Sequence, residues 1–174
     1  MTHRILAVAA LLLGVLAPFA GSPYRAQQQG IDVQELAAQV AREEDHVTAL
    51  ELAAWIKDRK PRLRVIDLRS EEEFDEYHVP RAELMSFEQL LSARFASDET
   101  IVLISDGGAH AAQAWVFLCA LGHEHVYFLR GGLGEWLDDV MNPPKTTELS
   151  RYFGGTARGD RPADDAAKMR RRGC

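Results

Sequence analysis

The chain has 174 residues, which is enough for one domain with a hydrophobic core, and it carries a net charge of −6. The charge is unevenly placed, because residues 27–150 hold 23 acidic and 11 basic side chains. A body this acidic repels polyanions, so we expect no nucleic-acid partner for the folded part.

The N-terminal residues have the features of an export signal. Arg4 precedes an uninterrupted apolar run, Ile5 to Ala17, which is shorter than the roughly 20 residues that span a bilayer. We expect residues 1–26 to be a signal peptide, or an N-terminal anchor, because the small residues of a cleavage site are poorly matched around Pro18. The protein is therefore expected to be exported, to the periplasm or another extracytoplasmic space, and an uncleaved signal would hold it at the membrane.

Residues 27–46 are expected to form a linker and a short helix over Ile31–Glu44, with Asp32 as its N-cap. The main domain is expected over residues 47–144. It begins with a helix that Thr48 caps and Pro61 ends, followed by a strand over 63–69. Ser70 with Glu73 forms a capping-box pattern for a short helix, and another short helix is expected after Ser86.

The second half of the domain repeats the alternation of strands and helices. A strand over Thr100–Ile104 leads through a polar loop into a helix from about Ala109 to Leu121. The strand "VYFL" follows, and then the helix "GGLGEWLDDV", which Pro143 and Pro144 end. The alternation predicts an α/β protein with a parallel sheet covered on both faces. Residues 145–174, rich in Arg, Gly and Asp, are expected to be a disordered basic tail.

Two motifs and the loop between them resemble the rhodanese (sulfurtransferase) domain family. "VIDLRSEEEFDEYHVPRAELM" is similar to that family's Asp-x-Arg strand end, acidic helix and His-Ile/Val-Pro segment. "FLRGGLGEWLDDV" is similar to its closing Gly-Gly-x-x-x-Trp helix. The resemblance covers roughly residues 47–144, and it implies a rhodanese-like parallel sheet flanked by helices on both faces.

The family's active loop has the pattern Cys-x-x-Gly-x-Arg, and its backbone N–H groups surround a sulfur carried as a persulfide. The resemblance places Ser105 at the cysteine, Gly108 at the glycine and His110 at the arginine. A serine hydroxyl has no accessible anion near neutral pH and cannot carry a second sulfur, so we expect no persulfide at this position. The expected ligand-binding loop comprises Ser105, Asp106, Gly107, Gly108, Ala109 and His110.

Two residues of this loop change its charge relative to the family pattern. Asp106 is expected to cap the following helix, and its carboxylate would also repel an anionic substrate. His110 supplies a titratable charge in place of a permanent one. The remaining motif residues are expected to tie the strand end to the acidic helix as a structural frame rather than to act in catalysis: Asp67, Arg69, Glu73 and His78.

Our first hypothesis is an exported rhodanese-like domain, catalytically inactive as a sulfurtransferase, that binds an unidentified protein or small-molecule ligand. The alternative is an active thiosulfate-type sulfurtransferase whose cysteine lies elsewhere, or a loop that performs acyl or phosphoryl transfer. Cys119 is expected to be buried in a helix, and Cys174 ends the tail. Trp115 and Trp136 are expected in the core.

Other chemistry has weak support in the sequence. A hydrolase pair of Ser105 and His110 lacks the G-x-S-x-G pattern and a third residue to orient the imidazole. His123 and His125 are separated only by Glu124 and have no third ligand in view, so surface histidines are expected and no metal. We expect no cofactor.

Overall fold

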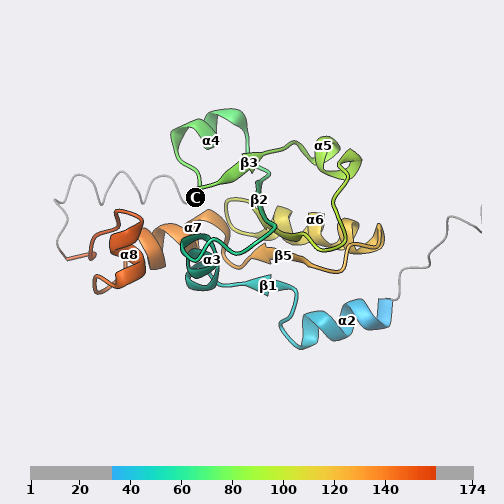
Figure 1. Ribbon diagram of the computed structural model, residues 1–174, viewed down its shortest axis with the longest axis horizontal. Coiled ribbons are helices and arrows are strands. Elements are labelled where there is room, and N and C mark those ends of the chain that lie inside the picture. The colour runs from blue at the N-terminus through green and yellow to red at the C-terminus, as the bar shows by residue number, and fades with distance from the viewer. Residues whose placement is uncertain (1–32, 160–174) are drawn as a thin grey trace, which may run out of the picture. The chain divides into compact units, whose positions relative to one another are not determined.

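The computed structural model describes residues 33–159, which belong to one compact unit. The first half contains α2 (Val33–Ala41), β1 (His46–Val47), α3 (Ala49–Lys57), β2 (Leu63–Asp67), α4 (Glu71–Glu76), β3 (Ala82–Leu84) and α5 (Phe87–Ser92) (Figure 1). The second half contains β4 (Thr100–Ile104), α6 (Ala109–Ala120), β5 (Val126–Leu129), α7 (Gly132–Trp136), the π-helical turn η3 (Leu137–Met141) and α8 (Glu148–Tyr152).

The sheet has five strands in the order β1-β5-β4-β2-β3, and every neighbouring pair is parallel. Parallel neighbours require crossover connections, and helices supply most of them here. The register aligns Asp67 at the end of β2 with Ile104 at the end of β4. The segments after these strands, which carry the predicted frame and the predicted loop, therefore start at the same edge of the sheet.

Both faces of the sheet are covered, as the alternation of elements predicts. Side chains along β4 point alternately to the two faces, and both sets are apolar. Val102 and Ile104 belong to one core cluster, and Ile101 and Leu103 belong to the other. The first cluster lies under α3, α7 and η3 and includes Trp136; the second lies under α5 and α6 and includes Trp115. The predicted α/β class and the predicted core positions of both tryptophans are confirmed.

Local sequence signals set the ends of several helices. Capping boxes join Thr48 to Glu51, Ser70 to Glu73 and Ser86 to Gln89, each at the N-terminus of a helix. The caps predicted at Thr48, Ser70 and Ser86 are therefore confirmed. The predicted cap Asp32 lies outside the described residues.

Three features of the fold differ from the sequence-based expectation. The two-residue strand β1 and the three-residue strand β3 were not predicted, because each is too short for an alternating pattern to show. The disorder expected from residue 145 is wrong for residues 145–159, which include α8. Thr147 caps α8, and Leu149 and Phe153 pack against the first core cluster, so a few apolar residues suffice to order this segment.

Residues 1–32 and 160–174 are not described, so the signal peptide or anchor expected at residues 1–26 lies outside the described part, as does Cys174. Within residues 33–159, no helix has the length and hydropathy needed to cross a membrane.

Candidate functional site

The candidate site consists of residues 105–108, which form the loop between β4 and α6, and of Ala109 and His110, the first two residues of α6. Ser105 follows the last residue of β4 and is 3% exposed, whereas Asp106, Gly107, Ala109 and His110 are exposed. Gly108 is buried and has a φ of 86°, in the left-handed region that glycine enters without a steric penalty. A side chain at Gly108 would also lie 3.2 Å from the Leu129 carbonyl oxygen, so this position is suited to glycine on two grounds.

Ser105 serves as the polar anchor of α6. Its Oγ accepts a hydrogen bond of 3.2 Å from the N–H of Ala111, in the first turn of the helix. The predicted cap at Asp106 is wrong, because the residue at the N-cap position is Gly108 and it makes no side-chain cap bond. The buried hydroxyl of Ser105 reaches a donor six residues ahead, which the sequence pattern of a cap one to three residues ahead does not anticipate.

Five consecutive N–H groups, those of residues 106–110, donate to no acceptor within the described part of the chain. The first N–H groups of a helix have no acceptor inside the helix. In the turn that ends at Gly108, the N–H groups of the residues before α6 are also without an acceptor in the described part of the chain. This set of donors is suited to an oxygen-bearing ligand. Because His110 lies in the first turn of α6 and is exposed, its imidazole is available to the same ligand.

The helix α7 packs against the loop and donates two backbone hydrogen bonds to it. The N–H groups of Leu133 and Gly134 donate to the carbonyl oxygens of Ser105 (2.9 Å) and Asp106 (3.2 Å). This approach is close enough that a side chain at Gly132 would overlap both carbonyl oxygens. The Gly-Gly at 131–132 thus allows α7 to fix the position of Ser105.

The frame residues lie beside the loop. Arg69 donates to both carboxylate oxygens of Asp67 at 2.7–3.2 Å, and the two side chains are 5% and 0% exposed. Arg69 also donates to the carbonyl oxygens of Glu73 (3.3 Å) and Tyr77 (2.7 Å) at the end of α4. The guanidinium thereby joins β2 to α4 and satisfies the buried carboxylate of Asp67.

His78 contacts Phe74 of α4 and makes no hydrogen bond to the loop within residues 33–159. Its Nδ1 is 2.9 Å from the Phe74 carbonyl oxygen, and its ring stacks on Phe74 at 4.0 Å. Tyr77 was missed in the sequence: its hydroxyl oxygen accepts from Trp136 Nε1 at 2.8 Å and connects the frame to the core. No spacing pattern predicts this bond, because the two residues are 59 positions apart.

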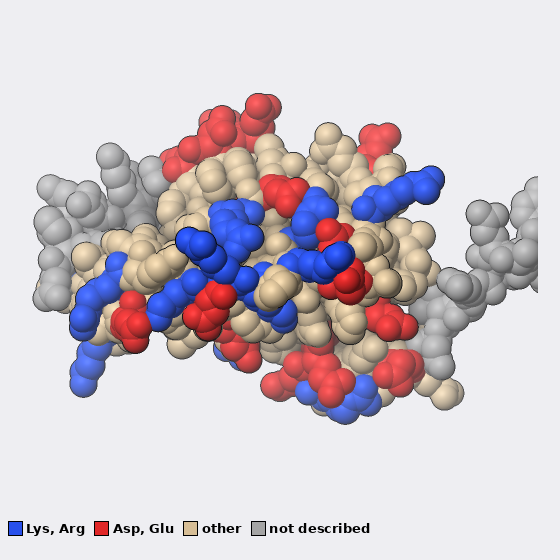
Figure 2. All heavy atoms as spheres, in the orientation of Figure 1, with Lys and Arg blue, Asp and Glu red and all other residues tan. Residues whose placement is uncertain are grey.

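The carboxylates around the loop make it a poor site for a strongly charged anion. Burial and the nearby Glu73 raise the pKa of Asp106 above its ordinary value, and Arg69 opposes this shift. Hydrogen bonds from Ser70 lower the pKa of Glu73. Acidic side chains also gather over α4, at the top of Figure 2. A ligand of the loop must therefore tolerate negative charge on one side.

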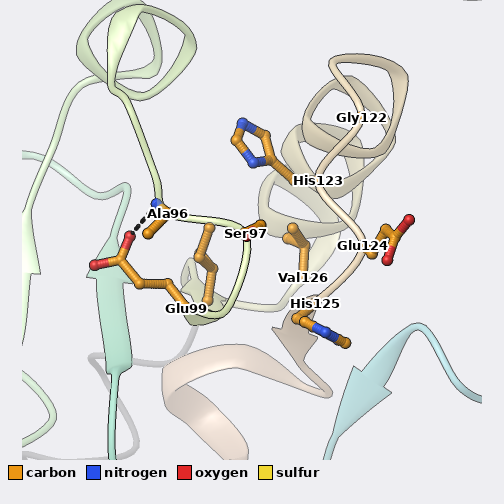
Figure 3. A pocket seen from close by; sticks show the side chains of 9 residues that line it. Ala96, Ser97, Glu99, Gly122, His123, Glu124, His125 and Val126 are labelled. Atoms are coloured by element: carbon orange, nitrogen blue, oxygen red, sulfur yellow. Dashed lines mark hydrogen bonds between the residues drawn. The ribbon is translucent and has the colours of Figure 1, made fainter.

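Cys119 and the two neighbouring histidines lie apart from the loop. Cys119 is partly buried, rather than fully buried as expected, and lies ten residues along α6 from Ala109, which is about 15 Å of helix. Burial raises the pKa of its thiol to about 11. His123 and His125 line a small pocket and point in different directions (Figure 3). Among residues 33–159, no cluster of three His, Cys, Asp or Glu is placed to hold a metal ion.

The structure combines a parallel α/β sheet with a turn, between a strand end and a helix, whose N–H groups have no acceptor among residues 33–159. Such a turn is an arrangement that binds anions in many proteins. The family profile described as "Rhodanese-like domain" matches residues 48–139, more than half of the chain. The chain therefore belongs to the rhodanese-like domain family, as the resemblance implies.

The chain is also similar to several solved structures. Similar structures include the Alr3790 protein from Anabaena sp., with 27% identity, 52% of this chain and 74% of that chain covered, and a TM-score of 0.48. A rhodanese-like domain protein from Staphylococcus aureus has 25% identity, 55% and 93% coverage, and a TM-score of 0.49. The human single-domain sulfurtransferase TSTD1 has 22% identity, 55% and 96% coverage, and a TM-score of 0.49. The comparison with curated proteins found no match.

Proposed function

We propose that this rhodanese-like domain does not transfer sulfur through its active loop and instead binds a ligand or partner there. The observation that carries the proposal is the state of Ser105. Its hydroxyl is buried and accepts the Ala111 N–H, so the atom at the nucleophile position is an oxygen engaged in holding the helix. An oxygen cannot replace the soft, readily ionised sulfur that a persulfide requires.

The ligand that suits the loop is a group with hydrogen-bond acceptor oxygens and limited negative charge. Five N–H groups and the His110 imidazole favour acceptors, whereas Asp106 and Glu73 oppose a dianion such as thiosulfate. A carboxylate or amide oxygen of a small molecule, or of a partner protein's side chain, meets both conditions. The acidic body argues against a nucleic-acid partner.

The state of Cys119 supports this proposal over an active transferase with a displaced cysteine. With its pKa raised to about 11, the thiol is almost wholly protonated at neutral pH and is a weak nucleophile. Cys174 lies outside the described residues and is the cysteine through which the alternative would act. Export belongs to the proposal as well, and N-terminal sequencing of the protein recovered from the producing cells tests it.

The test is turnover of thiosulfate and cyanide to thiocyanate by the purified full-length protein. We expect no thiocyanate above the blank. Turnover that disappears in Cys174→Ala would establish the alternative, and turnover that survives in both Cys119→Ala and Cys174→Ala would place the chemistry in the loop. The variant Ser105→Cys with His110→Arg is expected to gain a persulfide detectable by intact mass, because the turn and its N–H groups are present.

A further inference from the structure

A second hollow lies on a different part of the domain from the loop. It has a volume of about 630 Å³ and is lined by Ile56, Arg59, Pro80, Arg81, Tyr152 and Phe153. Arg59 and Arg81 precede the strands β2 and β3, whereas the loop follows the strand β4. Because the strands are parallel, residues that precede strands and residues that follow them lie toward opposite ends of the sheet. The hollow is thus separate from the candidate site.

The wall of the hollow combines apolar surface with two free positive charges. Neither guanidinium has an ion-pair or hydrogen-bond partner within residues 33–159, whereas Arg62, Arg64 and Lys57 on the same side of the domain are each paired with a carboxylate. No acidic residue lines the hollow. Figure 2 shows Lys and Arg side chains interleaved with Asp and Glu in the middle of the viewed face, where Figure 1 places α3.

The charge of this hollow contrasts with that of the whole domain. Residues 27–150 hold 23 acidic and 11 basic side chains, so an anion is repelled by most of the surface. Two unpaired arginines in one hollow make it a local exception, and guanidinium groups bind carboxylates in a two-pronged geometry. Ile56, Pro80 and the two aromatic rings provide apolar surface for the rest of a ligand.

The backbone at both arginines is also unusual. Arg59 and Arg81 have φ values of 54° and 70°, in the left-handed region that Gly and Asn adopt more readily than arginine. A long basic side chain is present at each of these turns although a smaller residue would fit the backbone more easily.

Part of the hollow lies outside the family domain. The rhodanese-like match ends at residue 139, whereas Tyr152 and Phe153 belong to α8 and the residue after it. Phe153 packs against Trp136, with ring centroids 5.2 Å apart, and against Tyr152 at 4.9 Å. The segment after the family domain therefore folds back and supplies the aromatic side of the hollow.

We infer that the hollow formed by Ile56, Arg59, Pro80, Arg81, Tyr152 and Phe153 binds a small soluble carboxylate with an apolar chain or ring. The carboxylate contacts Arg59 and Arg81, and the apolar part lies on Ile56, Pro80 and the aromatic rings. The inference does not depend on the function proposed for the loop.

The test is a titration of the ¹⁵N-labelled protein with octanoate, followed by amide chemical shifts. We expect shifts at residues of the hollow, with a Kd on the order of 1 mM or tighter. Arg59→Asn and Arg81→Asn remove the charge and keep a residue that tolerates φ > 0, and each is expected to weaken binding about tenfold. The matched control is Arg62→Asn, which changes an arginine with a φ of 55° outside the hollow and is expected to leave the Kd unchanged.

Further probes separate the proposed ligand from its competitors. Inorganic phosphate tests charge alone and 1-octanol tests the apolar chain alone; both are expected to bind at least about tenfold more weakly than octanoate. The inference is overturned if octanoate causes no shifts at the hollow, or if the arginine variants bind as tightly as the wild type. It is equally overturned if Arg62→Asn weakens binding to the same degree, or if phosphate alone binds as well.

Two other occupants of the hollow are distinguishable in the same series. Binding to phosphatidylglycerol vesicles without binding of octanoate would assign the surface to a membrane and overturn the inference. Shifts at the hollow that depend on protein concentration without ligand would assign it to a second copy of the chain, with the same consequence. Thiocyanate production needs none of the residues that line the hollow, so the outcome of that assay and the outcome of the octanoate titration are separate results.

Discussion

At the scale of single residues, Ser105 decides the chemistry of the loop. The family resemblance placed it at the nucleophile position, because the loop keeps the length of the family pattern. What the sequence did not reveal is the partner of its hydroxyl. Oγ accepts from Ala111, six residues ahead, because the left-handed turn at Gly108 brings the helix back over the strand end. The side chain at the family's nucleophile position therefore accepts a backbone hydrogen bond at the start of α6.

Asp106 gives a prediction at the same scale. Burial and the nearby Glu73 raise the pKa of the Asp106 carboxyl group above its ordinary value of 3.8. The group therefore takes up its proton at a higher pH than an ordinary aspartate does. Because the carboxylate repels anions, sulfate binding by the wild type is expected to strengthen as pH falls through this raised pKa. Asp106→Asn is expected to bind sulfate up to about tenfold more tightly at pH 7, which corresponds to about 1.4 kcal/mol. Its affinity for sulfate is also expected to change less with pH than that of the wild type.

Calorimetric titration with sulfate between pH 4 and pH 8 is the measurement. His110→Gln is the control, because it removes the contribution of the imidazole in the same loop. If Asp106→Asn leaves both the affinity and the pH profile of the wild type unchanged, the carboxylate does not govern anion binding. The same sign applies to stability: a raised pKa in the folded state means that the ionised carboxylate opposes folding, so the variant is expected to be no less stable at pH 7.

At the scale of elements, the contact between the loop and the helix α7 holds the site in place. Gly132, with a φ of 59°, lies against the carbonyl oxygens of Ser105 and Asp106. Gly132→Ala is expected to lower the free energy of unfolding by about 2–4 kcal/mol, because the methyl group forces the loop and α7 apart. The control Gly134→Ala places its methyl group 3.9 Å from the nearest of these atoms and is expected to change stability by less than about 1 kcal/mol.

Chemical denaturation of both variants tests this prediction. Equal stability of Gly132→Ala and the wild type would mean that α7 does not fix the loop. Sequence reasoning found the Gly-Gly pair as part of a motif, but the reason for it required the structure. Gly132 lies 27 and 26 positions from Ser105 and Asp106, the residues it approaches, and the parallel sheet brings them together.

Prediction of the elements from the sequence succeeded where the signal was local. Each capping box, at Thr48, Ser70 and Ser86, is formed by two residues three positions apart, and the strand β4 is one short apolar run. The strands β1 and β3 were not predicted, because their pairing with β5 and β2 defines them and their composition does not. Of the residues predicted for the frame, Arg69 bonds to Asp67 and to the carbonyl oxygen of Glu73, and Tyr77 was not foreseen as the link to Trp136.

At the scale of the whole molecule, the domain extends beyond its family boundary. Composition predicted disorder from residue 145, because basic and small residues dominate the tail as a whole. The prediction averaged over two unlike parts: residues 145–159 contain Leu149 and Phe153, which pack on the first core cluster, and Ser150, which is fully buried. A short window with two apolar residues does not stand out within a polar tail of 30 residues.

This extension gives a prediction for truncated proteins. A protein that ends at residue 144 loses the packing of Phe153 on Trp136 and is expected to be about 3 kcal/mol or more less stable. A protein that ends at residue 159 keeps these contacts and is expected to match the full chain to within about 0.5 kcal/mol. Thermal denaturation of the two compares them directly, and equal melting temperatures for all three proteins would show that α8 contributes nothing to the fold.

Whether the loop carries sulfur is decided most directly by the mass of the intact protein after incubation with thiosulfate, followed by peptide mapping. We expect an unchanged mass for the wild type and an added sulfur atom on the variant Ser105→Cys with His110→Arg. An added sulfur on the native chain that a thiol or cyanide acceptor removes at an enzymatic rate would contradict it.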